Sequence, residues 1–165
     1  MRDSSLSACI QAVMAAEVGF LELAHDYLGE AALMDLHDLH QNARDGVHVA
    51  SLAGSWIALV AGLGGMRDSN GQLSFAPRLP SRITGLEFSL LWRGLRLRVE
   101  VTAEEVTYSL RNGGGSARLD LLHHGKEVTI TQVKPVVLPI PPALPVGPVP
   151  TQPPGRAPVR RATGV

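Results

Sequence analysis

The spacing of apolar residues changes part-way along this 165-residue chain, and this change limits the folds open to it. Up to about residue 66, apolar residues recur every three or four positions, which predicts amphipathic helices. From about residue 72 they alternate with polar ones, most regularly in LRLRVEVT (residues 95–102), which predicts strands with one buried face. Helices followed by strands across a sharp boundary predict an α+β fold or two separate modules.

The helical part is apolar on nearly every side. A first helix is expected from an N-cap at Ser4 or Ser5 to a break at Gly19, with Gly29 separating the next two helices and a fourth starting near Val47. One side of the first helix carries large apolar residues at helical spacing, while Cys9 and several alanines make its other side small and apolar too. A helix that is apolar all round is normally buried, so we expect this part to belong to something larger.

Short strands at about ten-residue spacing predict a small antiparallel β-sandwich between residues 67 and 133. Glycine-containing turns are expected to connect them, at Ser69-Asn70-Gly71, Arg93-Gly94, Asn112-Gly113-Gly114 and His123-His124-Gly125. His123 and His124 are interpreted as surface loop residues. The helical domain is accordingly assigned to residues 1–66 and the sandwich domain to residues 67–133.

Residues 134–165 contain ten of the twelve prolines and no aromatic or acidic residue. Such a segment cannot bury a core, so it is predicted to be extended and disordered. Its LPIPPALP stretch is compatible with a polyproline II docking segment, but the composition favours a spacer.

Composition excludes several kinds of partner. The net charge is zero, so no nucleic-acid partner is predicted, and the apolar runs are too short for a membrane span. No signal peptide follows Met1, and a cytoplasmic protein is expected. The single cysteine, Cys9, excludes an internal disulfide and is expected to be a buried thiol.

The stretch RDGVHVASLAGSW (residues 44–56) is the strongest candidate for a binding site. His48, Ser51 and Ser55 share one face of the predicted helix, and its N-terminal N–H groups suit an anion such as phosphate. The alternative is that Asp45 caps the helix while small residues such as Gly54 permit close packing. Chemistry alone favours the second interpretation, because caps are general at helix starts and anion sites are not. No P-loop signature is present.

A second polar cluster, DLHDLH, offers four metal-ligand types: Asp35, His37, Asp38 and His40. No matching pair of ligands follows elsewhere in the chain, so a solvated helix end is favoured and no metal site is predicted. No pair of carboxylates stands out for acid–base catalysis either.

Three motifs, the first in the stretch RDGVHVASLAGSW, resemble the C-terminal part of glycoside hydrolase family 65, which contains maltose, trehalose and kojibiose phosphorylases and related hydrolases. The resemblance covers about residues 3–133 and includes DSSLS (residues 3–7) and FSLLWRGLRLRVEV (residues 88–101). The matching positions are Asp45, Gly46, His48, Ala50, Ser51, Ala53, Gly54 and Trp56; then Gly62, Gly64, Gly65, Met66 and Arg67; then Leu73, Phe75, Pro77, Leu79 and Pro80.

The resemblance implies that the helices are the last ones of an (α/α)6 catalytic barrel and that the sandwich is the C-terminal domain. It also implies phosphorolysis with inversion, with inorganic phosphate as co-substrate and no cofactor. Gly46, His48 and Ser51 are then expected to bind phosphate. A histidine at position 48, where hydrolytic members are expected to carry a carboxylate, favours phosphorolysis.

The resemblance also implies that the general-acid glutamate lies outside this chain. Arg2 stands where the family usually has histidine, and the chain begins where an intact enzyme would be near its end. We therefore expect a fragment that is inactive alone, with a missing N-terminal polypeptide or a homodimer completing a site for disaccharide and phosphate. The alternatives are a fragment of a trehalase-type hydrolase and a non-catalytic interaction module.

Overall fold

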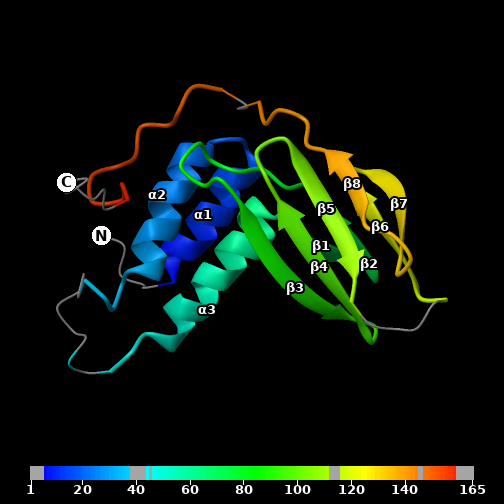
Figure 1. Ribbon diagram of the computed structural model, residues 1–165. Helices are drawn as coiled ribbons and strands as arrows, with labels where there is room; N and C mark the ends of the chain where they lie inside the picture. Colours follow the sequence, from blue (N-terminus) through cyan, green and yellow to red (C-terminus); the bar gives the residue numbers. More distant parts are fainter. Residues whose placement is uncertain (1–5, 38–43, 45, 112–115, 145–146, 159–165) are drawn as a thin grey trace. The chain divides into compact units, whose positions relative to one another are not determined.

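The computed structural model describes residues 6–37, 44, 46–111, 116–144 and 147–158 (Figure 1). The chain forms two compact units, of which the helical unit comprises Met1–Gly62 with Leu144–Val165 and the sheet unit comprises Leu63–Ala143. Helices therefore precede strands, and the α+β class predicted from the change in apolar spacing is confirmed.

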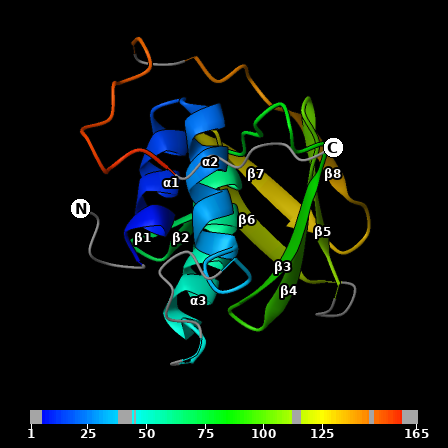
Figure 2. The same ribbon diagram turned by 90° about the vertical axis from the view of Figure 1, so that its left-hand side faces the viewer.

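The helical unit contains three α-helices among its described residues: α1 (Ser7–Glu17), α2 (Leu21–Ala32) and α3 (Val49–Ile57). A π-helical turn, η2 (Ala58–Leu63), continues α3. Figures 1 and 2 show α1 and α2 side by side. Gly19 follows α1 with a φ of +85°, as expected for a glycine that ends a helix.

The predicted helix end at Gly29 is wrong, because α2 continues through it to Ala32. An interior glycine costs a helix only about 1 kcal/mol relative to alanine, and strong helix formers surround it here. The backbone N–H of Leu33 still donates to the Gly29 carbonyl, at 3.2 Å.

Small side chains make the inner face of this unit. The buried residues of α1 are alanines and one cysteine: Ala8, Cys9, Ala12, Ala15 and Ala16. A Cβ on Gly54 would lie 2.6 Å from Cys9 Sγ, so α1 and α3 approach as closely as the packing interpretation predicted. Large apolar residues of α1, its two cap positions and α3 are exposed instead: Leu6, Ile10, Met14 and Val18 for α1, and Val49, Leu52, Trp56 and Ile57 for α3. This distribution is unusual for a free-standing helical domain.

The described residues of the sheet unit form two four-stranded sheets (Figure 1). One has the order β1-β2-β6-β7, with β1 (Arg67–Ser69), β2 (Gln72–Phe75), β6 (Arg118–His123) and β7 (Lys126–Thr131). The other has the order β3-β4-β5-β8, with β3 (Leu86–Trp92), β4 (Leu95–Val101), β5 (Glu105–Leu110) and β8 (Val136–Pro139). Strand pairs are antiparallel except β2 and β6, which pair in parallel through Ser74↔Leu122 and Phe75↔His123. The expectation of a wholly antiparallel sandwich is corrected here, because the chain passes through the second sheet between these two strands and can return in the same direction.

In the part of this unit that the structure describes, two-residue turns close three hairpins. Their residues have positive φ at both positions, as type I′ turns require: Asn70-Gly71, Arg93-Gly94 and His124-Gly125. These turns were predicted. The turn predicted at Asn112-Gly113-Gly114 lies outside the described residues.

His123 is buried, which corrects its interpretation as a surface loop residue. Strand alternation places it on the inward row of β6 with Leu119 and Leu121. Its Nδ1 lies 3.1 Å from the Tyr108 hydroxyl and its Nε2 lies 3.0 Å from the Pro139 carbonyl oxygen. Both ring nitrogens therefore have partners, which is what allows an imidazole to occupy a core position.

The proline-rich segment is not disordered throughout, contrary to expectation. Val136–Pro139 forms β8, whose alternating apolar residues pair with β5 at the edge of the sheet, a position that tolerates proline. Further along, in the helical unit, Gln152 Oε1 lies 2.9 Å from the Tyr27 hydroxyl of α2. Pro158 is buried as well. Apolar alternation and one buried tyrosine thus hold parts of this segment in place.

His124 makes the stability of the sheet unit depend on pH. Burial of its imidazole, with the charges of His123 and Arg78 nearby, lowers the pKa of His124 to about 4. Between about pH 6.5 and 4 the unfolded chain therefore binds a proton that the folded chain does not, and stability falls as the pH falls. We expect His124→Asn, which suits a positive φ, to reduce the loss between about pH 7.5 and 5 by about 1 kcal/mol after allowance for solvent screening. Urea unfolding at the two pH values measures this difference, and equal losses in both proteins would contradict it.

Candidate functional site

The loop that leads into α3 places His48 against Asp35, which follows α2. The backbone N–H of His48 donates to Asp35 Oδ2 at 2.9 Å, and its ring Nδ1 lies 2.5 Å from Asp35 Oδ1. Gly46 precedes this contact with a φ of +127°, a conformation that favours glycine. The carboxylate therefore holds both the backbone and the ring of His48.

The charge of Asp35 determines which ring nitrogen of His48 carries a proton. The hydrogen bond from His48 lowers the pKa of Asp35, against the opposing effect of burial. An ionised carboxylate only accepts hydrogen bonds, so Nδ1 carries a proton and donates it to Asp35. The second ring nitrogen, Nε2, is the one that does not face the Asp35 carboxylate.

The Ser51 hydroxyl is engaged inside the helical unit. Its side chain is fully buried, and its hydroxyl donates to the Ala31 carbonyl of α2 at 3.0 Å. Ser55 in turn donates to the Ser51 carbonyl at 2.9 Å. The structure brings Gly46 and His48 together on the loop but directs Ser51 into the contact between α2 and α3. A phosphate contact from the Ser51 hydroxyl would require it to release Ala31.

The helix start differs from the capping interpretation. The N-cap residue of α3 is His48, whose own side chain makes no capping hydrogen bond among the described residues. Asp45, the expected cap, lies outside the described residues. The carboxylate that contacts this helix start is Asp35, which sequence analysis assigned to a different cluster. The signal in the sequence was a carboxylate thirteen residues before His48, in the run predicted to end the preceding helix.

The metal candidates do not assemble in the described part of the chain. Asp35 is engaged by His48, His37 is exposed, and Asp38 and His40 lie outside the described residues. Within the described ranges, His, Cys, Asp and Glu residues nowhere form a group of three able to hold a metal ion. None of the helices described is long and apolar enough to span a membrane.

Known families match both units. Residues 1–57 match the glycosyl hydrolase family 65 central catalytic domain, and residues 66–130 match the C-terminal domain of the same family. The chain belongs to glycosyl hydrolase family 65. The resemblance drawn from its motifs is confirmed.

The relatives in this family include uncharacterized glycosyl hydrolases and trehalose phosphorylases. An uncharacterized glycosyl hydrolase of Mycobacterium leprae is 56% identical over 161 residues, covering 98% of this chain and 20% of the relative. An alpha,alpha-trehalose phosphorylase of Thermoanaerobacter brockii is 42% identical over 111 residues, covering 67% of this chain and 14% of the relative. This chain thus spans about a fifth or less of the length of these family 65 proteins.

A solved structure supports the fold. A protein of the human microbiome described as a candidate kojibiose phosphorylase superposes with a TM-score of 0.76 at 24% identity. The match covers 84% of this chain and 20% of the solved one.

Proposed function

We propose that this chain is the C-terminal part of an inverting disaccharide phosphorylase acting on α-glucosides, in which His48 binds the attacking phosphate. The main support is that Asp35 contacts both the backbone N–H and the ring Nδ1 of His48. A ring fixed in this way presents Nε2 in a defined direction, as a group that positions a co-substrate must. The trehalose phosphorylase among the relatives supports this proposal.

The imidazole can meet phosphate in two protonation states. As an imidazolium, it donates Nε2–H to a phosphate oxygen, and the carboxylate of Asp35 balances its charge. As a neutral ring, it accepts a hydrogen bond at Nε2 from a protonated phosphate oxygen. Either contact holds phosphate for attack on the anomeric carbon, opposite the bond that breaks, while a general acid from another part of the enzyme protonates the leaving sugar. No cofactor enters this reaction.

A second candidate is a non-catalytic interaction module, favoured by the exposed apolar residues of α1 and α3. Ile10 and Met14 are 54% and 64% exposed, and Trp56 is 49% exposed. Apolar faces of this kind often mark interaction sites. In the phosphorylase proposal, the remaining polypeptide of the enzyme covers the same faces.

Titration of the full chain with inorganic phosphate, followed by NMR of the chain's amides, tests the proposal. His48→Ala is expected to weaken phosphate binding by about tenfold or more, because one charge-assisted hydrogen bond contributes about 1.5–3 kcal/mol. The matched control is His37→Ala, which removes an exposed histidine of the same unit and should leave the affinity unchanged.

Equal phosphate affinity in the His48→Ala variant and the unsubstituted chain would overturn the assignment of His48. Absence of saturable phosphate binding in the unsubstituted chain would favour the interaction module. A trehalase-type hydrolase also predicts no specific phosphate site, so the same result would favour that alternative over phosphorolysis.

A further inference from the structure

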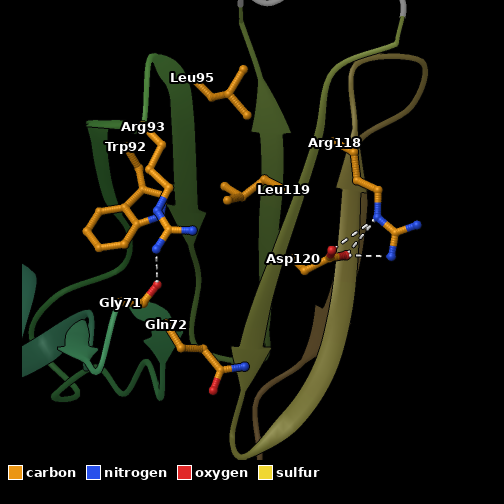
Figure 3. A pocket seen from close by; sticks show the side chains of 8 residues that line it. All are labelled: Gly71, Gln72, Trp92, Arg93, Leu95, Arg118, Leu119 and Asp120. Carbon is orange, nitrogen blue, oxygen red and sulfur yellow. Dashed lines mark hydrogen bonds and ion pairs between the residues drawn. The ribbon is translucent and has the colours of Figure 1, made fainter.

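A pocket of about 450 Å³ opens in the sheet unit, at the end of the sandwich where the β1–β2 and β3–β4 turns meet the start of β6 (Figure 3). It is formed entirely within this unit. Neither the sequence motifs nor the family match assigns a role to it.

Apolar side chains line its centre. Trp92, Leu95 and Leu119 belong to the core-facing rows of β3, β4 and β6, at the ends of those strands. Further along the same rows, residues such as Leu97 and Leu121 are fully buried, whereas Trp92 is only partly buried. A large indole is thus left at the open mouth of the core, where a ligand can pack against it.

Arg93 fixes one side of the pocket. Its guanidinium carbon lies 5.6 Å from the centre of the Trp92 ring, and its Nη2 donates to the Gly71 carbonyl at 2.7 Å. This bond joins two type I′ turns, Arg93-Gly94 and Asn70-Gly71, that belong to different sheets. The indole is therefore held in place by a side chain that is itself bonded, so this wall is preorganised.

Polar groups on the outer face of β2 and β6 border the pocket. Figure 3 shows Arg118 and Asp120 across the pocket from Trp92, with Gln72 at its lower end. Arg118 Nε donates to Asp120 Oδ1 at 3.0 Å, and Thr129 Oγ1 donates to the same oxygen at 2.6 Å. The hydrogen bond from Arg118, followed by that from Thr129, lowers the pKa of Asp120, so this carboxylate is ionised.

The separation of β2 from β6 creates the space between these groups. Their parallel pairing begins at Ser74↔Leu122, so Gln72 and Asp120 stand two residues before it on each strand. Each lies two residues from a paired residue, so both side chains are on the outer face of the sheet, opposite to the buried Leu119. An amide, a carboxylate and a guanidinium with both donors and acceptors thus border the opening.

We propose that this pocket binds the ring of a neutral saccharide, as a second saccharide site separate from the His48 loop. A sugar ring has C–H faces that pack on an indole and hydroxyls that both donate and accept hydrogen bonds, which matches the Trp92 indole on the core side of the pocket and the polar side chains of Gln72, Arg118 and Asp120 at its border. The charges argue against an anion, because Arg118 is paired with Asp120 and Arg93 is bonded to Gly71. The choice of a glucosyl unit as the sugar rests on the proposed function.

Trp92 itself reports binding. The chain has two tryptophans, so Trp56→Phe leaves Trp92 as the sole indole. Titration of this variant with maltotriose is expected to change its fluorescence saturably. Ligand-observed NMR of the full chain with maltotriose then compares Asp120→Asn, Trp92→Ala and a control, Leu91→Ala, which removes a neighbouring side chain that is 72% exposed on the opposite face of β3.

Asp120→Asn and Trp92→Ala are expected to weaken maltotriose binding at least about fivefold, since each removes a contact of about 1 kcal/mol or more, whereas Leu91→Ala leaves it unchanged. Asp120→Asn keeps the shape of an exposed side chain, so its result stands even if Trp92→Ala disturbs folding. Absence of a saturable signal, equal binding in the Asp120→Asn variant, or displacement of maltotriose by inorganic phosphate would overturn the proposal. His48→Ala should bind maltotriose normally, so failure of the phosphate site is distinguishable from failure of this one.

Discussion

Gly65→Ala is expected to destabilise the sheet unit by about 3 kcal/mol or more. Gly65 has a φ of +61°, and a Cβ there would lie 2.2 Å from the Ala76 carbonyl oxygen and 2.4 Å from its carbon. These are backbone atoms, and the Ala76 N–H also donates to the Gly65 carbonyl at 3.2 Å. The two segments cannot separate without breaking this contact, so alanine adds a steric clash to the cost of a left-handed backbone. Urea unfolding followed by Trp92 fluorescence, in the Trp56→Phe background, measures the change.

Gly94→Ala is the matched control for this substitution. Gly94 has a φ of +82°, and nothing lies within 4 Å of a Cβ built there. It should therefore lose only the backbone term, about 1 kcal/mol. If the two substitutions destabilised the sheet unit equally, the close approach at Ala76 would have no energetic role.

Turn chemistry explains why much of the sheet unit was predictable. Asn70-Gly71, Arg93-Gly94 and His124-Gly125 each place a glycine where a two-residue hairpin turn needs positive φ. A turn of fixed length also fixes the register of the strands beside it, as in Trp92↔Leu95. Both signals are local, so the sequence alone was sufficient.

Pairings between distant segments were not predictable in the same way. The parallel contact of β2 with β6 joins residues almost fifty positions apart, and β8 pairs with β5 across the whole β6–β7 hairpin. Proline content predicted disorder for the segment that contains β8. Composition contains no information on whether the edge of a sheet, here β5, is available for pairing. The buried position of His123 likewise depends on Tyr108 and Pro139, which lie in other strands.

The candidate site shows the same division. The motif around His48 was found from the sequence, because its residues are contiguous. The direction of Ser51 was not, since helical spacing places it on the same face as His48 while packing against α2 turns its hydroxyl to Ala31. The contact of Asp35 with His48 was missed because Asp35 lies thirteen residues before His48, in a run whose composition suggested a metal site or a solvated helix end.

Asp35→Asn is expected to weaken phosphate binding by about 10- to 100-fold if His48 is the ligand, the usual range for the loss of a group that orients a ligating histidine. Asparagine keeps the shape of the side chain but has one carbonyl oxygen in place of a charged carboxylate. Its one oxygen can accept a hydrogen bond from the His48 backbone N–H or from the ring Nδ1–H, whereas the carboxylate has a separate oxygen for each. The imidazole then loses its fixed direction and its charge partner. NMR titration with inorganic phosphate measures the affinity, and Asp35→Glu, which restores the charge, should recover part of it.

Asp120→Asn supplies the control, because it makes the same chemical change in the sheet unit. It should leave phosphate affinity unchanged and reduce maltotriose binding, whereas Asp35→Asn should do the reverse. Opposite effects of the two substitutions would show that each acts on its own site. A misfolded chain would instead lose the binding of both ligands. If Asp35→Asn bound phosphate as tightly as the unsubstituted chain while His48→Ala did not, His48 would bind phosphate without needing Asp35 to orient it, and the carboxylate would only stabilise the loop.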